Sequence, residues 1–186
     1  MSRFAVDPAQ VERVQRTALK LFDQLSSSFS LGNSFRVMLG WAAELHEIGL
    51  GLSHDGYQQH SAYLVEASDM AGFSRQEQYF LAALVGFQRD EIPGNYAARL
   101  PGRLHDPLCI SLLCIRLAWV FCRTREDVAI PDMNISRHGN RLDLKLPADW
   151  MLNHPLTIAD LEYEEQALKK IGLQLSIAYV DHESGR

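Results

Sequence analysis

Three histidines and one acid lie close together in the chain, a density that is typical of a metal or proton-transfer site. His46 and Glu47 are adjacent, and His54 and His60 follow shortly after them. Imidazole and carboxylate groups are common ligands of divalent transition metals. These four residues are the candidate metal ligands. The alternative is structural: His46 and Glu47 would close a helix and tie it to the segment 53–60, and His60 would be a core histidine with a hydrogen-bonded ring.

Arginines form a second candidate site, for an anion. Between Arg89 and Arg125 the chain has six arginines against three acids, a balance of +3 in a protein of net charge −5. Arg89, Arg99 and Arg103 border a loop broken by proline and glycine, where side chains reach a ligand without disturbing helix packing. The planar fork of arginine suits phosphate oxygens. We expect these three to bind a polyanion, unless they brace the loop or pair with Asp90, Glu91 and Asp106.

Other chemistries find little support. There is no Gly-x-Ser-x-Gly motif and no glycine-rich phosphate loop. The cysteines Cys109, Cys114 and Cys122 lie in one apolar run without a C-x-x-C spacing, which indicates buried, reduced thiols. The acidic run from Asp160 to Glu165, with lysines one turn on, is interpreted as a solvated helix face with i,i+4 pairs.

The elements that must position these residues are mostly helices. Apolar spacing predicts helices over about 11–25, 38–48, 60–67 and 75–89. Ser74 and Glu77 fit a capping box at the start of the fourth. After an irregular stretch, Asp106 is predicted to cap a further helix with Pro107 at its first position. That helix is apolar nearly all round and is therefore expected to be the central buried one.

The apolar period then changes from 3.6 to 2. Residues around 133–135 and 142–146 alternate, with Gly139-Asn140 as a hairpin turn between them. A helix is predicted from Pro155 to about Gly172, followed by a strand over 173–179. The fold class is therefore mainly α: a helical domain over residues 1–128, followed by a small α+β appendage of ββαβ order over 129–186.

Composition limits the class of protein. An apolar fraction of 47% and a charged fraction of 22% are those of an ordinary globular protein. The acidic balance argues against a nucleic-acid binder, and the first eight residues lack a signal peptide. The most apolar run, residues 108–122, is shorter than the roughly 20 residues that a membrane span needs. We expect a cytoplasmic protein with no nucleic-acid or membrane partner.

The sequence resembles the HD-domain phosphohydrolases at several positions. Arg13-Val14 is present, but Gln10 stands where that superfamily has its first metal-binding His. His46-Glu47 stands in place of the His-Asp pair, and Leu117-Ala118-Trp119 in place of Leu-Ala-Asp. Two ligand positions are therefore replaced and a third is altered. The resemblance implies an HD-like helical bundle whose metal site has lost most of its ligands.

A narrower resemblance covers nearly the whole chain. The segments 45–50 (LHEIGL), 59–65 (QHSAYLV) and 70–73 (MAGF) look like the C-terminal part of the exopolyphosphatase / guanosine pentaphosphate phosphohydrolase family. The segments 6–8, 21–25 and 146–150 and the Arg116 helix also resemble it, in the same order. In that family, catalysis and magnesium binding belong to a preceding pair of domains. The resemblance implies a part without cofactor or catalytic residues that dimerises and extends the groove for polyphosphate.

Three hypotheses follow. The first is a non-catalytic, polyphosphate-guiding and dimerising part of an enzyme that acts on inorganic polyphosphate or guanosine pentaphosphate. The second is an active metal phosphohydrolase of the HD class that uses His46, Glu47, His54 and His60. The third is a protein-interaction module that has lost its ligands. A homodimer is expected on a further ground, a surplus of large apolar residues: Trp41, Phe80, Phe87, Trp119 and Phe121.

Overall fold

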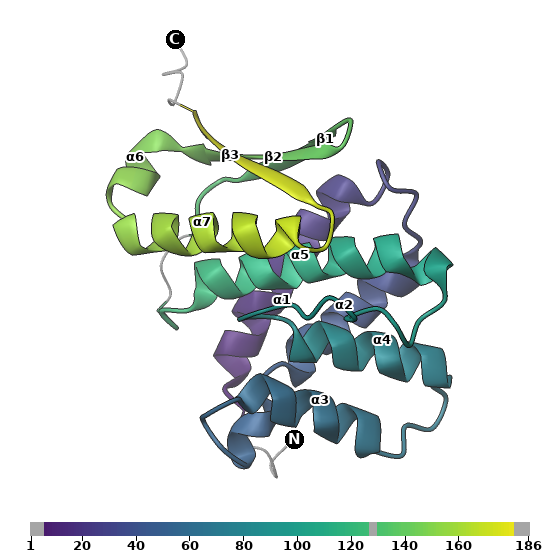
Figure 1. Cartoon of the computed structure of the whole chain (residues 1–186). Helices are drawn as coiled ribbons and strands as arrows, with labels where there is room; N and C mark the ends of the chain where they lie inside the picture. The colour runs from purple at the N-terminus through teal and green to yellow at the C-terminus, as the bar shows by residue number, and fades with distance from the viewer. Residues whose placement is uncertain (1–5, 127–129, 181–186) are drawn as a thin grey trace.

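A computed structural model of the chain describes residues 6–126 and 130–180. Helices dominate the first part: α1 (Pro8–Leu25), α2 (Asn33–Leu45), the 3-10 turn η1 (Ile48–Gly51), α3 (Tyr57–Ala67) and α4 (Arg75–Gly86). A second 3-10 turn, η2 (Gly102–Leu104), leads into α5 (His105–Cys122). The second part contains β1 (Asn134–His138), β2 (Arg141–Pro147), α6 (Ala148–Leu152), α7 (Pro155–Lys169) and β3 (Gln174–Val180). The mainly α fold with a small α+β appendage is confirmed (Figure 1).

Local sequence explains where two of the helices, α1 and α4, begin. Asp7 caps α1 by accepting the Ala9 amide at 3.0 Å, with Pro8 as the first helical residue. The predicted capping box opens α4, with Ser74 and Glu77 bonding each other's backbone amides. The predicted cap at Asp106 is wrong. Because η2 runs directly into α5, that helix begins at His105, and Asp106 lies in its first turn.

Helix α5 is the centre of the molecule. It packs against α1, α2, α4 and α7, so apolar side chains are needed nearly all round it. The three cysteines lie on it, buried and free, as predicted, and burial raises the pKa of each thiol. The segment Gly102–Cys122 is long and apolar enough to cross a membrane, but 72% of its apolar window is buried inside the protein, which is also what a core helix shows.

The appendage is a three-stranded sheet in the order β1-β2-β3. Gly139, at φ +62°, makes the predicted hairpin turn between the antiparallel strands β1 and β2. Strand β3 pairs parallel to β2, so the chain must cross over between them through α6 and α7. Helix α6 was not predicted, because five residues are too few to show a helical period. The order is thus ββααβ rather than ββαβ.

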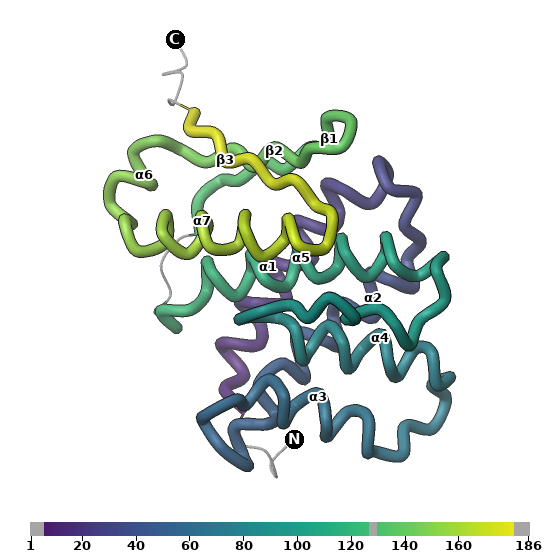
Figure 2. The backbone as a smooth tube through the Cα atoms, in the orientation of Figure 1, coloured from purple at the N-terminus to yellow at the C-terminus, as the bar shows by residue number. Residues whose placement is uncertain are grey.

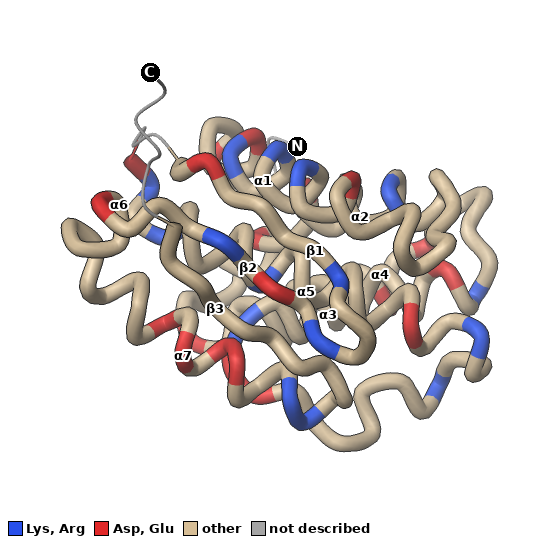
Figure 3. Tube along the Cα trace, turned by 90° about the horizontal axis from the view of Figure 1, so that it is seen from above, with Lys and Arg blue, Asp and Glu red and all other residues tan. Residues whose placement is uncertain are grey.

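One hydrophobic core joins the two parts. Leu142, Leu144 and Leu146 of β2 belong to the same buried cluster as Leu21 of α1 and Leu113 of α5. Figures 1 and 2 show the sheet lying over α7 and α5, with α3 and α4 on the opposite side of α5. Along β2, which lies in the sheet that Figure 3 shows from above, Arg141, Asp143 and Lys145 alternate with the buried leucines. The boundary at residue 128 falls outside the described residues and stays a prediction.

Candidate functional site

The end of α2 carries the central residue of the candidate site, His46. The ring is 0% exposed, and its Nδ1 lies 2.6 Å from the carbonyl oxygen of Ala43. A carbonyl only accepts, so Nδ1 carries the proton and Nε2 keeps its lone pair. Burial lowers the pKa of this imidazole, although Glu47 acts in the other direction. His46 is therefore neutral in the folded protein near pH 7.

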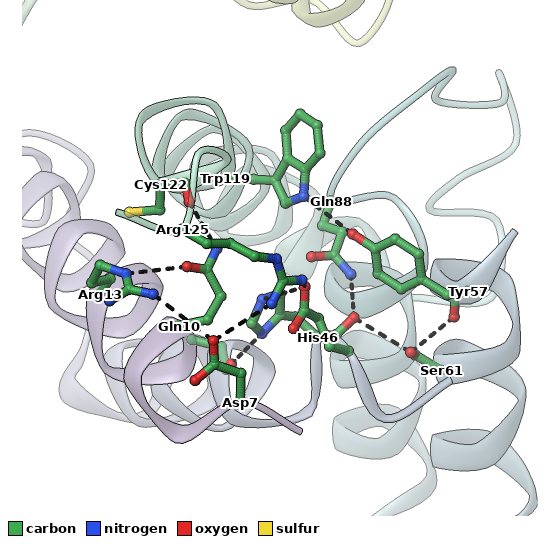
Figure 4. A network of polar contacts seen from close by, with 12 residues as sticks. Asp7, Gln10, Arg13, His46, Tyr57, Ser61, Gln88, Trp119, Cys122 and Arg125 are labelled. Atoms are coloured by element: carbon green, nitrogen blue, oxygen red, sulfur yellow. Dashed lines mark hydrogen bonds and ion pairs between the residues drawn. The ribbon is translucent and has the colours of Figure 1, made fainter. Parts of the chain in front are cut away.

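Glu47 is buried beside that ring and is bound by an arginine that lies just after α5, 78 residues along the chain. Its Oε1 lies 3.8 Å from His46 Nε2 and accepts a hydrogen bond from Nη2 of Arg125. The Arg125 side chain is 43% exposed, and its Nη1 lies 3.7 Å from the Asp7 carboxylate. We call Asp7, His46, Glu47 and Arg125 the Glu47 cluster; Figure 4 labels Asp7, His46 and Arg125 of this cluster. Its arginine already neutralises the buried acid.

The backbone at this point is held from two neighbouring elements. The His46 carbonyl accepts hydrogen bonds from Gln88 Nε2 at 2.6 Å and from Ser61 Oγ at 3.3 Å. Ser61 Oγ also accepts the Gly49 amide at 2.8 Å. A Cβ on Gly49 would lie 2.6 Å from the Ser61 amide nitrogen, so only glycine permits this contact with α3. The predicted tie to segment 53–60 is instead made with Ser61, just after it, and with Gln88.

The two residues that stand at replaced HD ligand positions make tertiary hydrogen bonds. Gln10 Nε2 donates to the Cys122 carbonyl at 2.9 Å, and Gln10 Oε1 accepts from Arg13 Nε at 3.2 Å. Trp119 Nε1 donates to Tyr57 Oη at 3.1 Å. Both side chains thus connect helices around the Glu47 cluster, as Figure 4 shows. Each hydrogen bond satisfies a polar atom that would otherwise be left unpaired on burial.

The four candidate metal ligands are not assembled together. His46 and Glu47 are neighbours, whereas His54 is exposed on the loop after η1 and His60 is half-buried on α3. Within residues 6–126 and 130–180, no group of three His, Cys, Asp or Glu side chains is arranged to hold a metal ion. The cation that lies against Glu47 is a guanidinium.

The candidate polyanion ligands differ in how their charge is used. Arg99 makes two hydrogen bonds to the Glu66 carboxylate, at 2.8 and 2.7 Å, and lies 3.6 Å from the Tyr79 ring centroid. Arg89 pairs with Asp90 at 3.3 Å and lies over the rings of Trp119 and Tyr57. Arg103 donates to the neutral amide of Gln76 at 3.0 Å, and no described acid pairs with it.

In the folded protein, acids from other parts of the chain neutralise most of the positive charge of the segment 89–125. Arg116 is 0% exposed and is bound by Glu164 through Nε at 2.6 Å and Nη2 at 2.9 Å. It also donates to the carbonyls of Phe87 and Asp90, and so fixes the loop that carries Arg89. Arg123 pairs with Asp160 at 2.7 Å. Acids outside the segment neutralise four of the six arginines: Arg99, Arg116, Arg123 and Arg125.

The same pairs correct the interpretation of the acidic run on α7. Glu164 is 4% exposed, and with Asp160 it faces α5 rather than solvent. Lys170 pairs with Glu91, far along the chain, at 2.8 Å. The predicted i,i+4 pairing between this run and its lysines is thus replaced by tertiary ion pairs. The role of Arg125 was missed as well, because its partner Glu47 lies 78 residues away and no local pattern connects them.

Comparisons with known proteins find one matching family and several similar sequences. Residues 1–165 match the family described as Ppx/GppA phosphatase, domain III. A guanosine-5'-triphosphate,3'-diphosphate pyrophosphatase of Aeromonas hydrophila is 32% identical over 92% of this chain and 35% of its own length. Proteins of the same name from Pseudoalteromonas translucida and Aeromonas salmonicida are 30% and 32% identical, over 95% and 92% of this chain. The chain spans about a third of the length of these relatives.

Proposed function

This chain belongs to the Ppx/GppA phosphatase family as its domain III, and from that membership we propose a non-catalytic role in phosphate-chain hydrolysis. It would be the C-terminal part of an enzyme that removes terminal phosphate from guanosine pentaphosphate or inorganic polyphosphate. In this proposal magnesium and the reacting groups belong to the remaining two thirds of the protein, which acts in the cytoplasm. This chain contributes polyphosphate binding and dimerisation.

The observation that carries the proposal is the state of Glu47. A carboxylate that acts as general base or metal ligand must have its oxygens available to the proton or the ion. Glu47 is 2% exposed, and its Oε1 is bound by Arg125. His46, its neighbour, uses one ring nitrogen on the backbone and lies fully buried. This arrangement supports a structural role for the pair in the resting protein.

The direct test is phosphate release by the purified 186-residue chain with magnesium or manganese. We expect no release above the blank from polyphosphate or guanosine pentaphosphate. Release that is abolished by His46→Ala but kept by the exposed control His54→Ala would overturn the proposal. It would support the HD-class enzyme instead.

Of the three candidate arginines, Arg103 is the best placed to bind phosphate. Its hydrogen bond goes to an uncharged amide, so a phosphate gains a full opposite charge there. Arg99 would first have to leave Glu66. Arg103 lines a cavity of ≈ 270 Å³ between α2 and α4, beside Gln76 and Ser74. We therefore propose that a polyphosphate chain passes along η2 and the start of α4.

Binding by charge neutralisation weakens steeply with salt, so the salt slope tests this path. The double variant Arg99→Ala/Arg103→Ala should lower polyphosphate affinity and flatten the slope, with Arg103→Ala alone giving most of the change. The matched control Arg16→Ala/Lys20→Ala removes the same charge from the exposed face of α1. If the two double variants behave alike, or if slope and affinity are unchanged, the chain must bind elsewhere or not at all. The last result would favour the interaction module.

We propose dimerisation through apolar residues of α6 and α7, because most of the apolar residues that the sequence suggested are buried or half-buried. Of the five residues named from the sequence, Phe80 is 2% exposed and belongs to the core, Phe87, Trp119 and Phe121 are half-buried, and Trp41 is 39% exposed. The most exposed large side chains near α6 and α7 are Leu152 at 83% and Leu156 at 70%, with Tyr163 at 53%. We expect light scattering to give a dimer mass, and Leu152→Ser/Leu156→Ser to give a monomer. A monomer mass for the wild type would contradict the dimer.

A further inference from the structure

The two edges of the three-stranded sheet are bonded differently. At the β1 edge, the side chain of Gln24 from α1 takes the place of a further strand: its Oε1 accepts the Ile135 amide at 2.8 Å, and its Nε2 donates to the Met133 carbonyl at 3.4 Å. Strand β3 forms the other edge and pairs with β2 alone. Among residues 6–126 and 130–180, no hydrogen bond reaches the backbone of β3 from its outer side. Figure 3 shows β1 on the side of α1 and β3 on the side away from it.

The sequence of β3 lacks the residues that usually protect an open edge. The strand has seven residues, Gln174–Val180 (QLSIAYV), with no charged side chain and no proline among them. Natural proteins place lysine, proline or a bulge on exposed edges, because the free N–H and C=O groups there pair readily with another strand. The covered strand β1, by contrast, contains an arginine and a histidine. An open, uncharged edge is typical of a strand that pairs with a further chain.

We propose that β3 pairs antiparallel with β3 of a second copy of this chain, about a two-fold axis at Ile177, so that the two sheets become one. This inference rests on the proposed dimer and assigns a backbone contact to it. Leu175, Ile177 and Tyr179 are opposite the buried leucines of β2 and share the inner face of the sheet. With Leu175 opposite the partner's Tyr179, all seven residues are paired and both inner faces lie on the same side. A shift by one residue would put the two cores on opposite sides of the sheet.

Each copy offers both halves of a side-chain contact across this axis. At one end of β3, Tyr179 is 56% exposed. At the other end, a cavity of ≈ 280 Å³ lies beside Leu175 and is also lined by Glu165 and Lys169 of α7. In the proposed register the Tyr179 ring of each copy reaches the cavity of the other, which is the self-complementarity that a two-fold contact needs. Helix α6, which carries the exposed Leu152, contacts β3, so the apolar surface proposed for the dimer continues onto this edge.

Charges placed across the axis test both the pairing and its register. Ser176 would lie opposite the partner's Ala178 on the face of the sheet away from the core, so Ser176→Lys/Ala178→Lys brings two pairs of like charges together. We expect this variant to raise the Kd of the dimer at least about tenfold in sedimentation equilibrium. Ser176→Lys/Ala178→Glu puts opposite charges at the same positions and should keep the Kd within about threefold of the wild-type value.

The matched control is Asn134→Lys/Ser136→Lys on β1, whose edge is already bonded. These two positions are opposite Lys145 and Asp143 of β2, the same neighbours that the two β3 positions have on their other side. The control therefore reproduces the added charge and its surroundings within one chain. It should leave the Kd of the dimer unchanged.

The outcomes separate this pairing from the proposed dimer. An unchanged Kd in Ser176→Lys/Ala178→Lys, or equal weakening by the control or by the variant of opposite charges, would overturn the pairing and leave the dimer in place. A monomer mass for the wild type would contradict the dimer and the pairing with it. If circular dichroism shows that the lysine variant does not fold, Tyr179→Ala tests the same contact and should raise the Kd at least about threefold. An unchanged Kd in Tyr179→Ala would also overturn the pairing.

Discussion

Two buried acid–arginine pairs of this molecule use the same chemical groups and differ in how fully those groups are bonded. Between α5 and α7, Arg116 is 0% exposed and divides its donors between both oxygens of Glu164 and the carbonyls of Phe87 and Asp90. In the Glu47 cluster, Arg125 is 43% exposed, and neither His46 Nε2 nor Glu47 Oε2 has a hydrogen-bond partner among the described residues. The first pair is saturated, and the second keeps unused acceptors.

The difference distinguishes a charged pair that fixes the structure from a pair whose cation remains partly in water. A buried pair in which every nitrogen and carboxylate oxygen is bonded fixes two elements in one arrangement, and it is costly to break because either partner alone is an uncompensated charge. A pair whose cation reaches solvent loses less when it is broken, because water can replace the missing partner. Arg116 therefore connects the appendage to the loop that carries Arg89, whereas Arg125 of the Glu47 cluster stays partly in contact with water.

The largest effect is expected where the saturated pair is broken. Glu164→Ala leaves Arg116 buried without a counter-ion, and we expect a loss of about 3–5 kcal/mol in the free energy of unfolding. Denaturation in urea measures it. Glu162→Ala, on the exposed side of the same helix, is the control and should change stability by less than about 0.5 kcal/mol. A similar loss of stability in Glu164→Ala and Glu162→Ala would show that the Arg116–Glu164 pair does not stabilise the fold more than an exposed acid does.

Glu47→Ala should cost less, about 1–3 kcal/mol, because Arg125 keeps its exposure to water. The same urea series measures it, with the exposed Glu12→Ala as its control. A loss as large as that of Glu164→Ala would mean that the Glu47 cluster is a saturated structural pair. A mutant of unchanged stability and altered metal content would instead assign Glu47 a ligand role in the wild type.

The neutral state of His46 predicts a pH dependence. Burial holds its pKa below the ordinary value of about 6.5, so the unfolded chain binds more protons than the folded one below that pH. The stability that His46 contributes is therefore present above about pH 6.5 and is lost as pH falls toward the folded pKa, by at most about 1.4 kcal/mol per pH unit. Unfolding free energies between about pH 7.5 and 5.5 should show this loss, and His46→Gln should reduce it. An identical slope in the variant would refute the assignment.

The smallest effect is expected at a third pair, in which both side chains are partly exposed. Arg123 and Asp160 are 30% and 28% exposed and lie 2.7 Å apart. Arg123→Ala should lower stability by about 0–1 kcal/mol, and this loss should shrink further at high salt. A loss near that of Glu164→Ala would show that exposure does not order these three pairs.

The sequence by itself determined the elements and several of their ends. Apolar periods located the helices and strands, Ser74 and Glu77 identified the start of α4, and Gly139-Asn140 identified the hairpin. These features depend on residues a few positions apart, so a short window contains the whole interaction. The exceptions were also local in cause: α6 is too short for a period, and η2 shifted the start of α5 to His105.

Only the tertiary structure decided what the charged residues do. Arg116 and Glu164 are 48 residues apart, and Arg125 and Glu47 are 78 apart, so the local charge balance around each one gave no sign of its partner. The sequence around Glu164 is that of a solvated helix face, but α7 packs on α5 and Glu164 is paired there with Arg116. His46 and Glu47 were recognised as candidates by type and spacing. Whether they face water, a metal or a guanidinium depends on which residues folding brings within hydrogen-bonding distance.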